Sequence, residues 1–171
     1  QSAFSSTKNV PFSFLYDGKP SQSLMKKWKH QLQALPNTTA GEKKYLATYT
    51  DPVTRLQIVC KIDVYTTFNT VAWTLHLTNG GNKNTPQITQ LQASNIGIKD
   101  INNANKFQLY SSLGSDHNIN DFKLSKTELI ADKPIHLSPS HGRSSDTQSF
   151  PFFNVELKGH GGVLGAIGWT G

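Results

Sequence analysis

Two neighbouring segments of the chain alternate apolar and polar residues with a period of two, and this pattern constrains the fold more than any other feature. In the first segment, residues 54–65, the apolar positions are Leu56, Ile58, Cys60, Ile62 and Val64. In the second segment, residues 71–78, they are Val71, Trp73, Leu75 and Leu77. Alternation with β-branched residues predicts strands that bury one face. We expect the two segments to pair as antiparallel neighbours joined at residues 66–70.

Further segments are expected to form strands, and residues suited to tight turns separate them. The additional strands are expected at 10–16, 44–50, 87–98, 107–112, 122–128, 150–157 and 162–169. The turns are expected at Asp17-Gly18, Asp51-Pro52, 79–81 and 158–161. Only residues 21–32 resemble a helix, with Ser21 as the cap and Leu24, Met25 and Trp28 on one side. Many short strands with almost no helix predict an all-β sandwich or barrel, and we favour an antiparallel β-sandwich.

Size and charge limit the classes of protein to which the chain can belong. It has 171 residues and a mass of 18.9 kDa, which suits a single domain over residues 1–171. Lys and Arg number 17 against 11 acidic residues, but only Arg55 and Arg143 are arginines and the lysines are scattered. The densest basic run, residues 26–30, is short, so no nucleic-acid partner is expected. No apolar stretch reaches the roughly 20 residues of a membrane-spanning helix.

Residues that could bind a cofactor or a metal ion lack the spacing of known sites. The single cysteine, Cys60, excludes an internal disulfide and a CxxC motif, and its apolar neighbours predict a buried, inert thiol. The six histidines contain no HExxH motif, and no G-x-S-x-G motif occurs. The glycines of 159–168 lack the lysine of a phosphate loop. We therefore predict neither a cofactor nor a metal ion.

Carboxylates and exposed aromatic rings are the remaining candidates for sugar chemistry. Asp116 and Asp121 are the only close acidic pair in a loop-like segment, but aspartates in loops more often accept local backbone hydrogen bonds. Trp28, Trp169 and Tyr65 could stack on a sugar ring, although aromatic residues are more often structural. Trp73 has the apolar parity of its strand and is expected in the core.

Several segments resemble motifs of one enzyme family and occur in the same order. They are 71–81 (VAWTLHLTNGG), 84–86 (NTP), 114–116 (GSD), 121–122 (DF), 142–145 (GRSS), 150–154 (FPFFN) and 161–171 (GGVLGAIGWTG). The succession resembles that of α-galactosidase-like glycoside hydrolases, which are family 36 and its relatives in the melibiase clan. The resemblance covers residues 12–171. Ala72 and residues 92–94 depart from the pattern, because the family usually has acids there.

The resemblance implies a noncatalytic role within a longer enzyme. In that family the region is an amino-terminal β-supersandwich, and the (β/α)8 barrel that follows carries the two catalytic aspartates of a retaining mechanism. We therefore expect a sandwich that lacks strands at its carboxy-terminal edge, supports the barrel of the same polypeptide and takes part in homo-oligomer assembly. The resemblance also implies that loops contribute to the rim of a galactoside cleft or lock turns. The candidate residues are Asp116, His117, Asp121, Arg143 and Ser144.

Two other functions stay open at this point. A stand-alone carbohydrate-binding or adhesion module would bind sugar through an exposed Trp28 or Trp169, whereas a complete small enzyme would turn over galactosides by itself. The sequence begins at Gln1 rather than at a methionine, which fits removal of a signal peptide. We expect a secreted, periplasmic or cell-surface location, with the cytoplasm left open. The run 162–169 is expected to lack a neighbouring strand on one side, which favours association.

Overall fold

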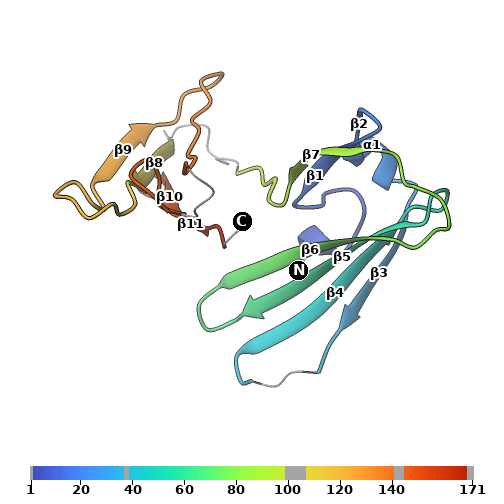
Figure 1. Cartoon of the computed structure of the whole chain (residues 1–171). Coiled ribbons are helices and arrows are strands. Elements are labelled where there is room, and N and C mark those ends of the chain that lie inside the picture. Colours follow the sequence, from blue (N-terminus) through green and yellow to red (C-terminus); the bar gives the residue numbers. More distant parts are fainter. Residues whose placement is uncertain (1, 37–38, 99–106, 141–144, 169–171) are drawn as a thin grey trace. The chain divides into compact units, whose positions relative to one another are not determined.

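The computed structural model describes residues 2–36, 39–98, 107–140 and 145–168 (Figure 1). Nearly all of the regular secondary structure in the described residues consists of antiparallel strands, so the predicted all-β class is confirmed. It divides into two compact units, Gln1–Gly97 and Ile98–Gly171, and each is described by itself. That residues 1–171 act as a single domain stays a prediction.

The larger sheet of the first unit contains the two alternating segments. Its strands are β3 (Lys29–Ala34), β4 (Glu42–Thr50), β5 (Leu56–Tyr65) and β6 (Thr70–Asn79), in the order β3-β4-β5-β6. The β5–β6 hairpin has the predicted antiparallel pairing, with Ile58 opposite Leu77 and Cys60 opposite Leu75. Side chains that lie opposite each other share a face of the sheet, so the apolar positions of both strands form one surface.

A smaller sheet covers this apolar surface and completes a two-layer sandwich. It consists of β1 (Ser13–Tyr16), β2 (Lys19–Pro20) and β7 (Ile88–Gln92), in the order β2-β1-β7. The largest fully buried apolar side chains come from both layers and from the short helix: Phe12, Phe14, Met25, Tyr49, Ile58 and Cys60. The rings of Phe12 and Tyr49 meet edge to face at 5.5 Å between centroids. This core is what holds the first unit together.

The predicted helix over residues 21–32 is mostly wrong. Helix α1 covers only Ser21–Met25, and strand β3 begins at Lys29. Pairing with β4 along one side of β3 gives residues 29–34 inter-strand hydrogen bonds and overrides their helix propensity. Ser21 is not the cap, because Pro20 holds that position without a side-chain hydrogen bond. Instead the buried Ser21 hydroxyl accepts a hydrogen bond from the Phe14 N–H at 3.1 Å.

Two predicted strands are shorter than expected, for local backbone reasons. Within 10–16 the strand begins only at Ser13, since Pro11 lacks an N–H and the register shifts between Ser13 and Leu15. Within 87–98 the strand ends at Gln92, and Gln90 has a φ of 50° that interrupts regular pairing. The turn at Asp17-Gly18 is confirmed, with φ values of 52° and 72°.

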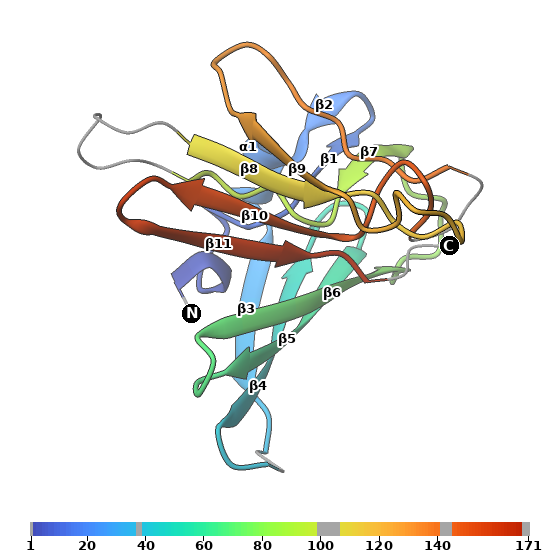
Figure 2. The same cartoon turned by 90° about the vertical axis from the view of Figure 1, so that its left-hand side faces the viewer.

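The second unit contains one four-stranded sheet. Its strands are β8 (Phe107–Ser112), β9 (Leu124–Glu128), β10 (Phe152–Leu157) and β11 (Gly161–Ala166), in the order β11-β10-β8-β9 (Figure 2). Gly159 and Gly161 have φ values of 82° and 93°, which a tight β10–β11 turn requires. Among the described strands β11 pairs only with β10, as the expected free edge requires. No helix in the described residues is long and apolar enough to cross a membrane.

Candidate functional site

The candidate residues that the structure describes lie at one end of the second unit's sheet. Asp116, His117 and Asp121 belong to the β8–β9 connection, residues 113–123. The β9–β10 connection supplies residues 138–140 and 145–151 at the same end. We call these three segments the loop rim. Two further candidates, Arg143 and Ser144, lie outside the described residues.

Asp121 stabilises the first loop of the rim by accepting hydrogen bonds from residues of the same loop. Its carboxylate accepts hydrogen bonds from the Asp116 N–H at 3.0 Å, the His117 N–H at 3.0 Å and the Ser115 hydroxyl at 2.7 Å. These donors, with the Asp116 N–H foremost, lower the pKa of the Asp121 carboxyl. Because the ionised form is favoured and its oxygens already have donors, Asp121 is poorly suited to act as a general acid.

The same hydrogen bonds fix an unusual backbone at the tip of the loop. His117 and Phe122 have φ values of 62° and 59°, in the left-handed region that non-glycine residues rarely adopt. The side chains of Asp116 and His117 are exposed there. A rigid loop therefore presents one carboxylate and one imidazole to solvent. Such an arrangement can accept and donate hydrogen bonds to a polar ligand.

Asp146, which the sequence analysis did not predict as a site residue, stabilises the second loop of the rim, in the β9–β10 connection. Asp146 is buried, and its carboxylate accepts hydrogen bonds from the N–H and the hydroxyl of Ser140. It also accepts from the N–H groups of Gln148 at 2.8 Å and Ser149 at 3.2 Å. These donors, led by the Ser140 hydroxyl, lower the pKa of Asp146 to about 2. The sequence offered only a weak signal for this role. An aspartate in a polar loop often accepts a hydrogen bond from the backbone N–H two residues later, which forms an Asx turn, and here that N–H belongs to Gln148.

The two loops contact each other at Gly114. A Cβ atom at this position would overlap the Ser145 hydroxyl and the carbonyl of Asp146, and would lie 2.7 Å from the Asp146 nitrogen. Next to this contact the rings of Phe122 and Phe150 meet edge to face at 5.6 Å. The structure thus brings together two segments that are more than twenty residues apart in the sequence, and only glycine fits at their contact.

The aromatic residues considered for a sugar platform do not share one surface. Trp28 is only 8 % exposed and packs against Phe14 and Tyr16, so the prediction of an exposed Trp28 is wrong. Its ring is needed by the core between the two sheets. Tyr65 is half-buried at the end of β5, and Trp169 lies outside the described residues. Trp73, which was expected in the core, is partly buried and packs against the core at its margin, with its ring 5.7 Å from that of Phe4.

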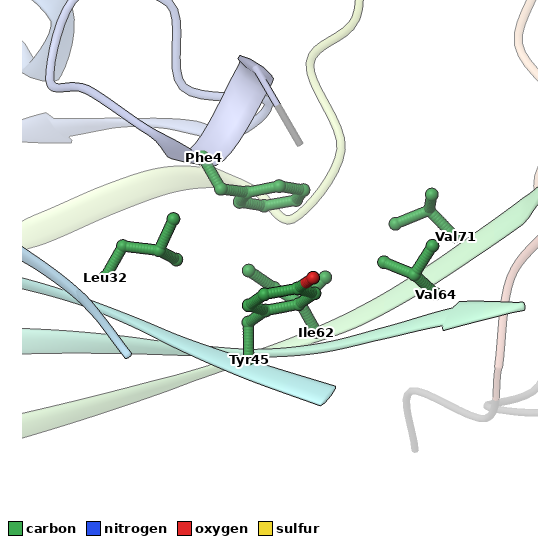
Figure 3. A pocket seen from close by; sticks show the side chains of 6 residues that line it. All are labelled: Phe4, Leu32, Tyr45, Ile62, Val64 and Val71. Carbon is green, nitrogen blue, oxygen red and sulfur yellow. The ribbon is translucent and has the colours of Figure 1, made fainter. Parts of the chain in front are cut away.

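A small apolar pocket lies beside the core of the first unit. Figure 3 shows its lining, which consists of Phe4, Leu32, Tyr45, Ile62, Val64 and Val71. Its volume of about 10 Å³ is near the lower limit for one water molecule, and the lining offers almost no polar surface. A sugar ring needs far more space and several hydrogen-bonding partners, so the pocket is a packing defect at the end of the sheet rather than a binding site.

Within the described parts of the chain, no group of three or more His, Cys, Asp or Glu side chains is placed to hold a metal ion. Cys60 is fully buried, as predicted, and burial raises the pKa of its thiol to about 12. The thiol is therefore almost entirely protonated at neutral pH and is a poor nucleophile.

Comparisons with profiles of protein families, with characterised proteins and with solved structures found no match to this chain. A functional assignment therefore depends on the residues of the loop rim and on the sequence motifs that contain them.

Proposed function

We propose that the chain is the noncatalytic amino-terminal β-supersandwich of a retaining α-galactosidase-type glycoside hydrolase. In this role it supports a catalytic barrel of the same polypeptide, contributes to assembly and places the loop rim near a galactoside cleft. The contact at Gly114 carries the proposal. It joins the GSD segment to Ser145, which is the one described residue of GRSS, and beside it the Phe122 ring of DF meets the Phe150 ring of FPFFN, so described parts of motifs that are far apart in the sequence lie against each other.

The chemistry of the rim supports a noncatalytic role. Glycoside hydrolysis needs two facing carboxyl groups, one of which must be protonated when the sugar bond breaks. Asp121 and Asp146 have lowered pKa values, and their oxygens are occupied by local donors. Both carboxylates therefore stabilise loops. Asp116 and His117 are left to contact a ligand at the rim.

Purification of the native protein tests this proposal. An antibody raised against the 171-residue chain would capture the protein from its host, and a nitrophenyl α-galactoside would report turnover. We expect the captured protein to release galactose with retention of the anomeric configuration, and the 171-residue chain alone to show no turnover. A captured protein without galactosidase activity would contradict the proposed parent enzyme. Turnover by the 171-residue chain would contradict the noncatalytic role.

Variants of the captured enzyme separate the two roles of the rim. Asp116→Ala and His117→Ala should raise KM for the galactoside and leave kcat unchanged, because both side chains are exposed on the rim, where the proposal places the substrate. Asp121→Ala should instead lower thermal stability, because three hydrogen-bond donors lose their acceptor. If KM is unchanged in both Asp116→Ala and His117→Ala, the rim does not bind the substrate and its role is purely structural.

One observation favours a stand-alone sugar-binding module as a second candidate. On one face of the second unit's sheet Asn154, Tyr110 and Lys126 lie opposite one another on three adjacent strands. The Tyr110 hydroxyl donates to Glu156 at 2.7 Å, and the Lys126 ammonium lies 5.1 Å from the Tyr110 ring centre. Amide, carboxylate and ammonium groups around an aromatic ring match the hydroxyls and apolar faces of a sugar.

This second candidate predicts that galactose binds to the 171-residue chain. NMR titration should shift the Tyr110 and Asn154 signals, and Asn154→Ala should abolish the shifts. Absence of any shift at high galactose concentration would eliminate the module.

A further inference from the structure

The formal charge of the chain is concentrated in the first unit. Of the 17 Lys and Arg residues, ten lie within Gln1–Gly97, together with only four of the 11 acidic residues. The second unit contains seven basic and seven acidic residues, so the first unit carries the whole formal charge of +6. Cations that lie close together create a positive potential, which attracts anionic partners.

Five of these cations, which are scattered in the sequence, gather at the end of the larger sheet that lies next to α1 (Figure 1). They come from the α1–β3 segment, the β4–β5 turn and the β6–β7 connection, and all five side chains are exposed. We call these residues the basic end: Lys26, Lys27, Lys29, Arg55 and Lys83.

Strand pairing and hydrogen bonds place the three segments of the basic end side by side. Lys29 lies opposite the last residue of β4, so the α1–β3 segment adjoins the β4–β5 turn. The Arg55 carbonyl accepts a hydrogen bond at 3.1 Å from the N–H of Gly80, which directly follows β6. The Asn79 side-chain amide donates to the Lys83 carbonyl at 2.8 Å. These contacts hold Lys83 beside the end of β6 and near the turn that contains Arg55.

The acidic residues of the first unit do not balance the charge of the basic end. Asp51 is buried, and two donors of its own turn occupy its carboxylate. Asp17 belongs to the β1–β2 turn of the smaller sheet. Glu42 and Asp63 lie toward the other end of the larger sheet, where the Lys44 ammonium approaches their carboxylates at 3.4 Å and 3.9 Å. Within this unit at most two acidic charges therefore oppose the five cations.

The face of the larger sheet that points away from the core continues from the basic end with polar side chains. Ile58 and Cys60 are buried, so their neighbours along β5 lie on the opposite face. Cross-strand pairing extends these neighbours into rows across all four strands. We call the three rows nearest the basic end the outer face: Lys29-Thr50-Gln57-Thr78, Gln31-Thr48-Val59-His76 and Gln33-Leu46-Lys61-Thr74. These rows contain no acidic residue and no Phe, Tyr or Trp.

We propose that the basic end and the outer face bind an anionic polysaccharide. Carboxylate or sulfate groups of the polymer pair with the ammonium and guanidinium groups of the basic end. The polymer's hydroxyls exchange hydrogen bonds with the Gln and Thr side chains of the outer face, which can both donate and accept. Neighbouring strands lie about 4.8 Å apart, so each row offers polar groups at intervals comparable with the length of one sugar unit.

Two other kinds of polyanion fit this surface less well. Single-stranded nucleic acid is bound by stacking of its bases on aromatic rings, and the outer face has no such ring. A duplex groove is entered by a helix or a two-stranded ribbon, whereas α1 has only five residues. Binding at an anionic membrane needs apolar side chains that insert among the lipids, and the β4–β5 turn offers only Val53 among the large exposed apolar residues.

This binding surface goes beyond the galactosidase role proposed above and does not depend on it. It lies in the first unit, whereas the loop rim belongs to the second. Binding is measured on the 171-residue chain, for which no galactosidase activity is needed. If the polysaccharide does not bind, the proposed parent enzyme is unaffected.

Isothermal titration of the 171-residue chain measures the binding. Polygalacturonate is the carboxylate probe, dextran sulfate is the sulfate probe, and dextran is the uncharged control. We expect at least one of the two anionic polymers to bind, and the one that binds more tightly identifies the preferred anion. The affinity should fall as salt is added, because salt screens the ion pairs, and dextran should not bind.

Two variants with the same formal charge separate the basic end from the charge of the whole chain. The test variant replaces three lysines of the basic end: Lys27→Gln, Lys29→Gln and Lys83→Gln. The control variant replaces three exposed lysines of the second unit: Lys123→Gln, Lys133→Gln and Lys158→Gln. The test variant should bind the anionic polymer roughly tenfold more weakly, since each exposed ion pair contributes a few-fold to the affinity. The control variant should bind like the unmodified chain.

Gln31→Ala and Gln57→Ala test the outer face. Each should lower the affinity for the anionic polymer and leave its salt dependence unchanged, because an amide is lost but no charge. Absence of binding at low salt would overturn the proposal, as would equal losses of affinity in the test and control variants. Unchanged affinity in both glutamine variants would overturn the assignment to a polysaccharide. Tighter binding of a single-stranded oligonucleotide or of phosphatidylserine vesicles than of either anionic polymer would do the same.

Discussion

Replacing Ile58 by alanine should destabilise the first unit by roughly 3 kcal/mol. The Ile58 side chain is 0 % exposed and lies on β5 between Tyr49 of β4 and Leu77 of β6. The change removes three buried carbon atoms, which accounts for roughly 2.4 kcal/mol at about 0.8 kcal/mol per CH₂. The cavity left between the two layers adds to this, and buried Ile or Leu to Ala changes typically cost about 2–5 kcal/mol.

Chemical and thermal unfolding, followed by tryptophan fluorescence, would measure this loss. In a unit of this size each kcal/mol shifts Tm by about 4–8 °C, so Ile58→Ala should lower Tm by roughly 12–24 °C. The matched control is Val53→Ala, because Val53 is 85 % exposed in a turn and its loss should change stability by less than about 0.5 kcal/mol. Equal effects of the two substitutions would refute the assignment of Ile58 to a core between two sheets.

Three further predictions follow from buried polar groups. Ser21→Ala should cost about 1–3 kcal/mol in urea unfolding, since the buried Phe14 N–H loses its acceptor, whereas Ser21→Thr should lose less. Because folding lowers the pKa of Asp146 to about 2 from an unfolded value near 3.8, its stabilisation is present above pH 4 and is lost as pH falls toward 2. The protection factor of the Ser149 amide, which corrects for the intrinsic pH dependence of exchange, should therefore fall over that range, and Asp146→Asn should abolish this pH dependence. Cys60 should react with a maleimide at pH 8 only as fast as the chain unfolds.

Each of these predictions has an outcome that would contradict it. Wild-type stability in Ser21→Ala would show that another group satisfies the Phe14 N–H. A protection factor of the Ser149 amide that stays constant between pH 4 and pH 2 would show that the loop does not depend on the charge of Asp146. Rapid labelling of folded protein would mean that Cys60 is accessible to solvent.

The central hairpin was predictable because its pattern is local and repeated. Between Leu56 and Leu77 nearly every second residue is apolar, and burial of one face fixes the register of both strands. Residues 29–34 lacked such a signal. Their sequence, KHQLQA, consists largely of good helix formers, and only pairing with β4 makes them a strand. This non-local contact cannot be inferred from the local composition.

The loop rim was predictable in part. The sequence identified the segment that contains Asp116 and Asp121, because polar residues without periodicity predict a loop. It did not identify Asp146 as the lock of the second loop. That role depends on Ser140, six residues earlier, and on the close approach of the chain at Gly114. The Ser140–Asp146 contact and the close approach at Gly114 depend on the pairing of β8 with β10, so the sequence alone does not predict them.

The intact mass of the protein made by its native host, together with its carboxy-terminal peptide, tests the central claim most directly. If the chain is the supporting domain of a galactosidase-type enzyme, the native mass should be several times 18.9 kDa, and peptides should continue beyond Gly171 into a catalytic barrel. A native product of 18.9 kDa that ends at Gly171 would contradict the claim, and the stand-alone sugar-binding module would then become the leading hypothesis.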